Sequence, residues 1–166
     1  TQSAVAPGTF ERTRMVNYGA DVGNFQFADI DHDGRLDLFH TMQGTPEVLM
    51  RLQDPDDPGA FPTITSTLPI NAGGVRLGRV DRDGLVDIVA STGTTATIYM
   101  ARQDHAGPGA FLPQTYSVAG GSGKESALVD VNGDWFGDVV YGAGNYFGSF
   151  LDCGHIAIHF QDPATP

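Results

Sequence analysis

The sequence predicts an all-β protein that is built from a repeated four-stranded unit. Two observations carry this prediction: the 166-residue chain contains 22 Gly and 10 Pro, and an Asp-rich segment recurs three times at near-constant spacing. Glycine at nearly twice its average usage of roughly 7% indicates many tight turns, and therefore many short strands. We find no convincing amphipathic helix between these turns.

The repeat has two landmarks that keep a constant phase. The first is the Asp-rich segment, which begins at Asp29, Arg79 and Asp130. The second is a Gln-Asp pair that leads into a Pro-Gly-Ala-Phe run, at 53–61 and again at 103–111. Because two landmarks in fixed phase are hard to obtain by chance, the chain is interpreted as one repeat array. We place its single segment, 1–166, in three repeats at approximately 7–57, 58–107 and 108–166.

Each repeat has the pattern of a series of strands around its Asp-rich segment. In the first repeat an apolar run at 36–40 follows that segment, and further branched or alternating runs lie at 47–52 and 61–68. Together with the strand that precedes the Asp-rich segment, this makes about four strands per repeat, each near the usual length. Sequential four-stranded units of about 50 residues are typical of the blades of a β-propeller. The sequence thus predicts a propeller with three blades per chain.

The net charge of the chain limits the classes of partner that it can bind. The 20 Asp and Glu residues against 9 Lys and Arg give a formal net charge of -11. Nucleic acid and anionic membrane surfaces both require a basic face, so neither is expected as a partner. Membrane insertion is not expected either, since no apolar run approaches the roughly 18 residues of a spanning helix. The first seven residues show no signal-peptide pattern, which would also hold for a mature secreted chain.

The Asp-rich segments follow the spacing D-x-D-x-D-G-x-x-D. Oxygen ligands at alternate positions of a tightly curled loop point toward one cation, and Gly34 permits the left-handed backbone that the curl requires. Calcium takes six to eight oxygen ligands and tolerates an irregular set, whereas magnesium requires stricter octahedral geometry. We therefore predict up to three Ca²⁺ sites. Their expected ligands are Asp29, Asp31, Asp33, the Arg35 carbonyl and Asp37; Asp81, Asp83, the Leu85 carbonyl and Asp87; and Asp130, Asn132, Asp134, the Phe136 carbonyl and Asp138.

The three loops are unequal. Arg79 stands where the first loop has an Asp, so we expect the second site to be the weakest, with the Arg79 guanidinium supplying part of the charge of a cation. In the third loop Asn132 replaces an Asp and Trp135 occupies the position of the turn glycine. We expect that loop to bind a metal with a strained curl.

An EF-hand is excluded as the alternative metal site, because it needs flanking helices and a Glu at loop position twelve. The residues at that position are His40, Ala90 and Tyr141.

The loops, together with Phe25 and Ala28 upstream of the first and the run 141–144 after the third, resemble FG-GAP/VCBS repeats. Such repeats form the calcium-binding propeller heads of integrin α subunits, some fungal lectins and many secreted bacterial proteins. The resemblance covers nearly the whole chain, from about residue 8 to residue 163. It implies structural calcium ions that lock the hairpin between two strands of a blade, and a secreted or extracellular location.

These observations favour a calcium-stabilised, non-enzymatic binding module that recognises a glycan or an extracellular protein. In the longer third repeat, Asn145, Tyr146 and Phe147 can stack on and hydrogen-bond a sugar ring; alternatively, these aromatic residues fill the space between blades. We find no catalytic pair, but a propeller-fold sugar-modifying enzyme is one alternative. A scaffold segment or fragment of a larger propeller protein is another.

Three blades are too few for a closed ring, since propellers typically have 4–8. The sequence opens with a lone strand-like run at 9–18 and ends after the third strand of the last repeat, which leaves an unpaired strand at each end. Two outcomes are expected: a homodimer that exchanges these strands and closes a six-bladed ring, or a piece of a longer propeller.

Overall fold

In a computed structural model of the chain, the described residues are 14–19, 21–70, 72–91, 97–107, 109–117, 126–143 and 155–161. All regular secondary structure in these ranges is β, so the prediction of an all-β protein is confirmed. Within the same ranges, no helix has the length and apolar character needed to cross a membrane.

The strands form three antiparallel sheets, in which each strand pairs with its neighbours in sequence. The first sheet contains β1 (Val22–Ala28), β2 (Asp37–Met42), β3 (Val48–Arg51) and β4 (Ile64–Leu68). The second contains β5 (Gly74–Gly78), β6 (Asp87–Ser91), β7 (Thr97–Gln103) and β8 (Phe111–Ser117). The third has three strands in the described residues: β9 (Ser126–Val129), β10 (Asp138–Ala143) and β11 (His155–His159).

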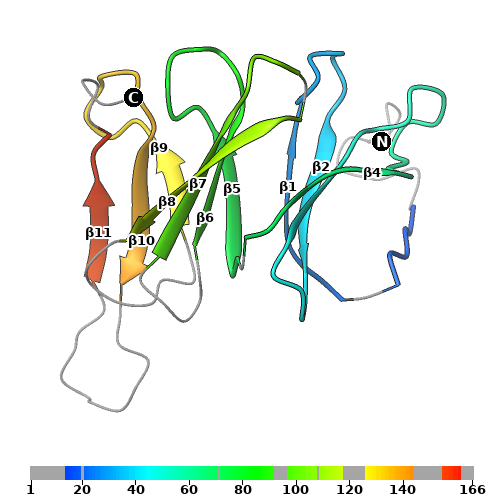
Figure 1. The fold of residues 1–166 in the computed structure, drawn as a ribbon, viewed down its shortest axis with the longest axis horizontal. Coiled ribbons are helices and arrows are strands. Elements are labelled where there is room, and N and C mark those ends of the chain that lie inside the picture. Colours follow the sequence, from blue (N-terminus) through cyan, green and yellow to red (C-terminus); the bar gives the residue numbers. More distant parts are fainter. Residues whose placement is uncertain are drawn as a thin grey trace, which may run out of the picture.

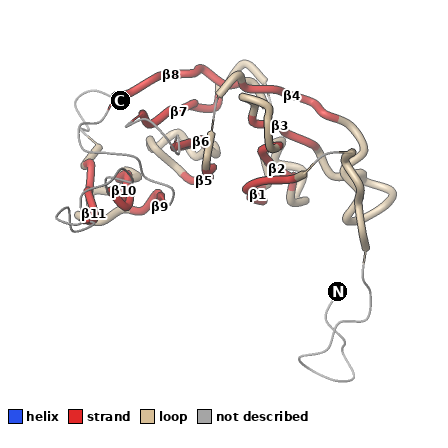
Figure 2. Tube along the Cα trace, turned by 90° about the horizontal axis from the view of Figure 1, so that it is seen from below, coloured by secondary structure: helices blue, strands red, loops and turns tan. Residues whose placement is uncertain are grey.

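The sheets lie side by side in chain order, from the blue and cyan first sheet to the yellow and red third sheet (Figure 1). β5 of the second sheet contacts both β1 of the first and β9 of the third. Figure 2 shows that these three strands lie on the inner side of an arc, whereas β4 and β8 lie on its outer side. The described residues thus form an open arc of three sheets.

Each Asp-rich loop connects the first two strands of its sheet. Residues 29–36 join β1 to β2, residues 79–86 join β5 to β6, and residues 130–137 join β9 to β10. Strands therefore flank all three loops, as the sequence predicts. The repeat boundaries at residues 57/58 and 107/108 fall between the third and fourth strands of the first two sheets.

The described part of the expected N-terminal strand, residues 14–18, does not form a strand. Side chains hold this segment instead of a backbone ladder. Arg14 donates two hydrogen bonds to the carboxylate of Asp57, at 2.7 and 2.8 Å. The ring of Tyr18 stacks on His40 with a centroid distance of 5.1 Å. A strand that pairs only with a second copy of the chain has no ladder partner within one chain, so the strand expected at 9–18 stays a prediction.

The hydrophobic core lies in two clusters, one on each face of the second sheet. Ile88 belongs to the cluster shared with the first sheet, where Phe39 is fully buried. Val89, the next residue, belongs to the cluster shared with the third sheet, where Val139 and Tyr141 are buried. Successive side chains of a strand point to opposite faces. The middle sheet is therefore covered on both sides, which explains the continuous apolar run of its strand β6.

Close approach between the second and third sheets depends on glycine. A Cβ atom at Gly137 would lie 2.4 Å from the carbonyl oxygen of Arg79 and 2.9 Å from the Leu128 side chain. A Cβ at Gly78 would lie 2.7 Å from Leu128. Because a backbone carbonyl cannot rotate away as a flexible side chain can, Gly137 is the stricter of the two requirements.

We expect Gly137→Ala to lower the free energy of unfolding by about 1–3 kcal/mol, the usual cost of overpacking. The matched control is Gly142→Ala in the same sheet, where an added Cβ meets nothing within 4 Å. Urea denaturation of both variants measures the difference. Equal midpoints for the two variants would contradict the packing of the third sheet on the second.

Candidate metal centre

The last Asp of each loop is the first residue of the second strand in its sheet, and its side chain is fully buried. One carboxylate oxygen accepts a hydrogen bond from the backbone N–H of the residue seven positions earlier, at 2.7–2.9 Å. The donor and acceptor pairs are Ile30 and Asp37, Val80 and Asp87, and Val131 and Asp138. Each carboxylate thus joins the end of its loop to a backbone N–H near the start of the same loop.

The other oxygen of each carboxylate reaches a different strand. It accepts a hydrogen bond at 2.9–3.0 Å from the backbone N–H of a glutamine at or just beyond the end of the third strand. These glutamines are Gln53, Gln103 and Gln161. The buried Asp therefore ties the loop between the first two strands to the third strand of the same sheet.

Burial raises the pKa of Asp37 and Asp87 above the ordinary value of an aspartate, and neighbouring loop carboxylates raise it further. The two backbone N–H donors to each carboxylate oppose these effects, because they favour the charged form. A cation bound beside either carboxylate would add to that opposition. Both sites thus combine a buried negative charge with like charges close by.

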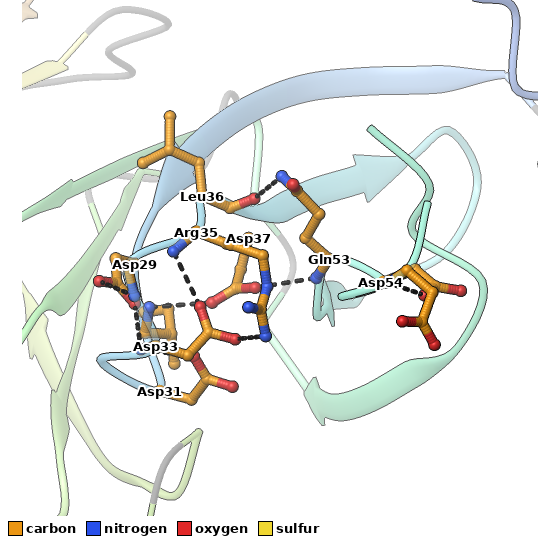
Figure 3. Close-up of polar contacts among 11 residues, drawn as sticks. Asp29, Asp31, Asp33, Arg35, Leu36, Asp37, Gln53 and Asp54 are labelled. Atoms are coloured by element: carbon orange, nitrogen blue, oxygen red, sulfur yellow. Dashed lines mark hydrogen bonds and ion pairs between the residues drawn. The ribbon is translucent and has the colours of Figure 1, made fainter. Parts of the chain in front are cut away.

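The first loop brings three carboxylates to one point. One oxygen each of Asp29, Asp31 and Asp37 lie within 4.8 Å of one another. The backbone N–H of Asp33 donates to Asp29 at 3.1 Å (Figure 3). The backbone N–H of Gly34 donates to the same carboxylate at 3.0 Å, and Gly34 has a φ of 84°. The curl is thus closed around carboxylate oxygens, which are the hard ligands that Ca²⁺, Mg²⁺ and Mn²⁺ prefer. This cluster can hold a metal ion.

Asp33 takes a different partner from the one expected. Its carboxylate accepts a hydrogen bond from the backbone N–H of Arg35 at 2.8 Å and pairs with the Arg35 guanidinium (Figure 3). Of the expected carboxylates in the first loop, the structure therefore brings together Asp29, Asp31 and Asp37, and it places Asp33 with Arg35.

The third loop repeats the curl of the first. Asp130 accepts hydrogen bonds from the backbone N–H groups of Asp134 and Trp135, at 3.1 and 2.9 Å, as Asp29 does at the corresponding positions. The amide of Asn132 donates to Asp134 at 2.8 Å. Trp135 has a φ of 72°. The strain expected of a non-glycine residue at this turn is thus present, because a left-handed backbone is unfavourable for such residues.

Two side chains from outside the second loop, a guanidinium and an imidazole, contact its carboxylates. Nη1 of Arg102 lies 3.6 Å from Oδ2 of Asp81, and Nε2 of His105 lies 3.3 Å from Oδ2 of Asp83. Arg79, the expected internal cation, has an exposed side chain. Sequence reasoning missed Arg102 and His105, although both positions carry uncharged residues in the other two repeats.

The three loops therefore differ as metal sites. Within the part of the chain that the structure describes, the first loop alone gathers three potential metal ligands of this kind within 4.8 Å. Asn145, Tyr146 and Phe147, the predicted ligand-binding residues, lie outside the described residues.

Comparison with known proteins leaves the family open: no protein-family model matches this chain, and no curated protein sequence matches it either. The resemblance to FG-GAP/VCBS repeats stays a prediction from the loop residues. The structure itself shows an all-β protein whose described residues form three antiparallel sheets, with an acidic cluster that can hold a metal ion.

Proposed function

We propose that this chain is a calcium-stabilised, non-enzymatic binding module with the architecture of a β-propeller segment. The cluster of Asp29, Asp31 and Asp37 carries the proposal. Calcium is favoured because the three clustered side chains offer only carboxylate oxygens, and calcium tolerates varied ligand geometry where magnesium requires an octahedron. Such an ion would offset the repulsion among these carboxylates and hold the connection between β1 and β2. The propeller is supported by the arc of repeated sheets, with the first strand of each innermost (Figure 2).

In this proposal, saturating calcium raises the melting temperature over that in EDTA by about 5 °C or more, since a ligand at 100 times its dissociation constant adds about 2.7 kcal/mol. We expect Asp31→Asn to lose most of this gain while its stability in EDTA changes little, because Asp31 is only partly buried. The matched control is Asp56→Asn, an exposed aspartate in the turn after β3. Calorimetry in both buffers measures the shifts. An undiminished calcium effect in Asp31→Asn would refute a calcium site in the first loop.

The ligand surface that we propose lies between the second and third loops. Trp135 is 80% exposed and lines a hollow of about 370 Å³ together with Arg79, Asp81 and Arg82. A flat aromatic face beside guanidinium and carboxylate groups suits a sugar, whose C–H face stacks while its hydroxyls form hydrogen bonds. The strained backbone of Trp135 also supports a functional role, because such strain concentrates at binding sites. We therefore favour a glycan over an extracellular protein.

Trp135→Gly separates binding from folding. It removes the aromatic face and relieves the left-handed backbone, so we expect loss of glycan binding together with a gain in stability of about 1 kcal/mol. A glycan array probed with labelled protein in calcium, and urea denaturation of the same samples, measure the two effects. Trp135→Phe, which keeps an aromatic ring, is the control and should retain part of the binding. Full glycan binding by Trp135→Gly would show that the ligand binds elsewhere on the protein. Turnover of a polysaccharide by the wild type would favour the alternative of a sugar-modifying enzyme.

The end sheets expose apolar side chains on the faces that point away from the second sheet. Phe25 and Phe27 of β1 are 56% and 46% exposed. At the corresponding positions of β5, Val75 is fully buried and Leu77 packs in the core shared with the first sheet. At the other end of the arc, Ile156 and Ile158 of β11 are exposed. Each end of the arc therefore exposes a sheet face. The equivalent face of the middle sheet is covered by its neighbour.

We propose that a second copy of the chain covers both faces. The internal repeat indicates that the natural cover is another sheet of the same kind, and two-fold symmetry lets two chains cover both pairs of ends at once. The product is a homodimer with six sheets in one ring. Additional sheets of a longer chain would cover the same faces and are the alternative outcome.

Sedimentation equilibrium tests the dimer. We expect a particle of about twice the chain mass of 17.6 kDa, and we expect the double variant Phe25→Ser/Phe27→Ser to be monomeric because it makes one end face polar. Leu112→Ser is the control, since Leu112 of β8 is 49% exposed but lies on the outer strand of the middle sheet. A wild-type monomer at high micromolar concentration would refute the homodimer and favour a longer chain.

A further inference from the structure

The second loop has its carboxylates paired with side chains that approach from the third strand of its own sheet. Arg102 is in β7, and His105 lies in the turn that follows β7. The side chains of their partners, Asp81 and Asp83, are only 15% and 19% exposed. Charges that are shielded from water interact more strongly than charges on an open surface. The Arg102 side chain is itself only 24% exposed, whereas the His105 side chain is 72% exposed, so the contact between Arg102 and Asp81 is the one that matters more to the loop than an ordinary surface ion pair.

Arg102 and His105 are both specific to the second repeat. The three glutamines that donate to the buried aspartates fix the correspondence between repeats. Relative to these glutamines, the residues that correspond to Arg102 are Leu52 and Phe160, and the residues that correspond to His105 are Pro55 and Pro163. None of these four residues carries a charge.

The residues of the second loop itself also carry less net negative charge than those of the other two loops. Segment 29–37 contains four carboxylates and one guanidinium, and segment 130–138 contains three carboxylates and no cation. Segment 79–87 contains three carboxylates and two guanidiniums, those of Arg79 and Arg82. The second loop therefore has the least negative charge to neutralise, even before Arg102 is counted.

Arg82 adds a further contact that ties the second loop in place. Its guanidinium donates a hydrogen bond to the carbonyl of Asp134 and lies 4.4 Å from the centroid of the Phe136 ring. Both partners belong to the third loop. The second loop is thus held by cations on two sides, from β7 within its own sheet and against the neighbouring loop of the next sheet.

We infer that the second loop binds no calcium, because the Arg102 guanidinium beside Asp81 takes the place that we propose for calcium in the first loop, while the His105 ring contacts Asp83. An ion placed among Asp81 and Asp83 would lie beside the Arg102 guanidinium and would have to displace it from its carboxylate. Repulsion between like charges opposes such binding. This inference rests on the calcium role proposed for the first loop, and it lowers the expected number of calcium ions from three to at most two.

Transplanting the residues of the first repeat tests this directly. The triple variant Arg79→Asp/Arg102→Leu/His105→Pro writes the residues found at Asp29, Leu52 and Pro55 into the second loop. Native mass spectrometry and calorimetric titration with calcium count the ions that the full chain binds. We expect the variant to bind one ion more than the wild type. An unchanged count in a folded triple variant would show that these residues do not decide metal binding, and would overturn the inference.

A single substitution keeps the test decisive if the triple variant does not fold. We expect Asp83→Asn to leave the number of calcium ions unchanged, because the second loop already holds none. Loss of one ion in Asp83→Asn would overturn the inference. The matched variant Asp31→Asn should lose one ion from the first loop. If Asp31→Asn loses none, the calcium role proposed for the first loop fails, whatever the result for the second loop.

Discussion

A buried carboxylate that accepts two backbone hydrogen bonds is the contact on which each sheet depends. In every repeat it joins the loop between the first two strands to the end of the third strand. Hydrogen bonds to a charged group are worth about 1.5–3 kcal/mol each, but a buried charge is costly unless it is compensated. Each loop must therefore place this carboxylate and also balance the negative charge around it.

The first two loops balance that charge in different ways. In the first loop Asp29 and Asp31 converge on Asp37, and a calcium ion is the proposed counter-charge. In the second loop the Arg102 guanidinium faces Asp81, and we infer that it supplies the counter-charge there. An arc in which one loop depends on calcium and its neighbour does not would keep part of its structure when calcium is scarce.

Much of this arrangement is predictable from the sequence, because it follows from local spacing. The Asp spacing places the loops between strands, and the glycine position of the first loop predicts the left-handed backbone found at Trp135 in the third. Contacts between distant segments were not predictable in this way. The pairing of Asp81 with Arg102 depends on how β7 lies beside the loop, and the exposure of Phe25 depends on which sheet covers it. Asp33 shows the same limit locally, since it pairs with Arg35 and does not converge with Asp29, Asp31 and Asp37.

The location of bound calcium is the most direct test of the claim that the first loop binds the ion and the second loop does not. Crystals of the chain grown in calcium, with diffraction data collected for anomalous scattering, locate each ion without reference to stability or ligand binding. We expect an anomalous peak among Asp29, Asp31 and Asp37, and no peak between Asp81 and Asp83. A map without a peak in the first loop, or with an equal peak in the second loop, would contradict this claim.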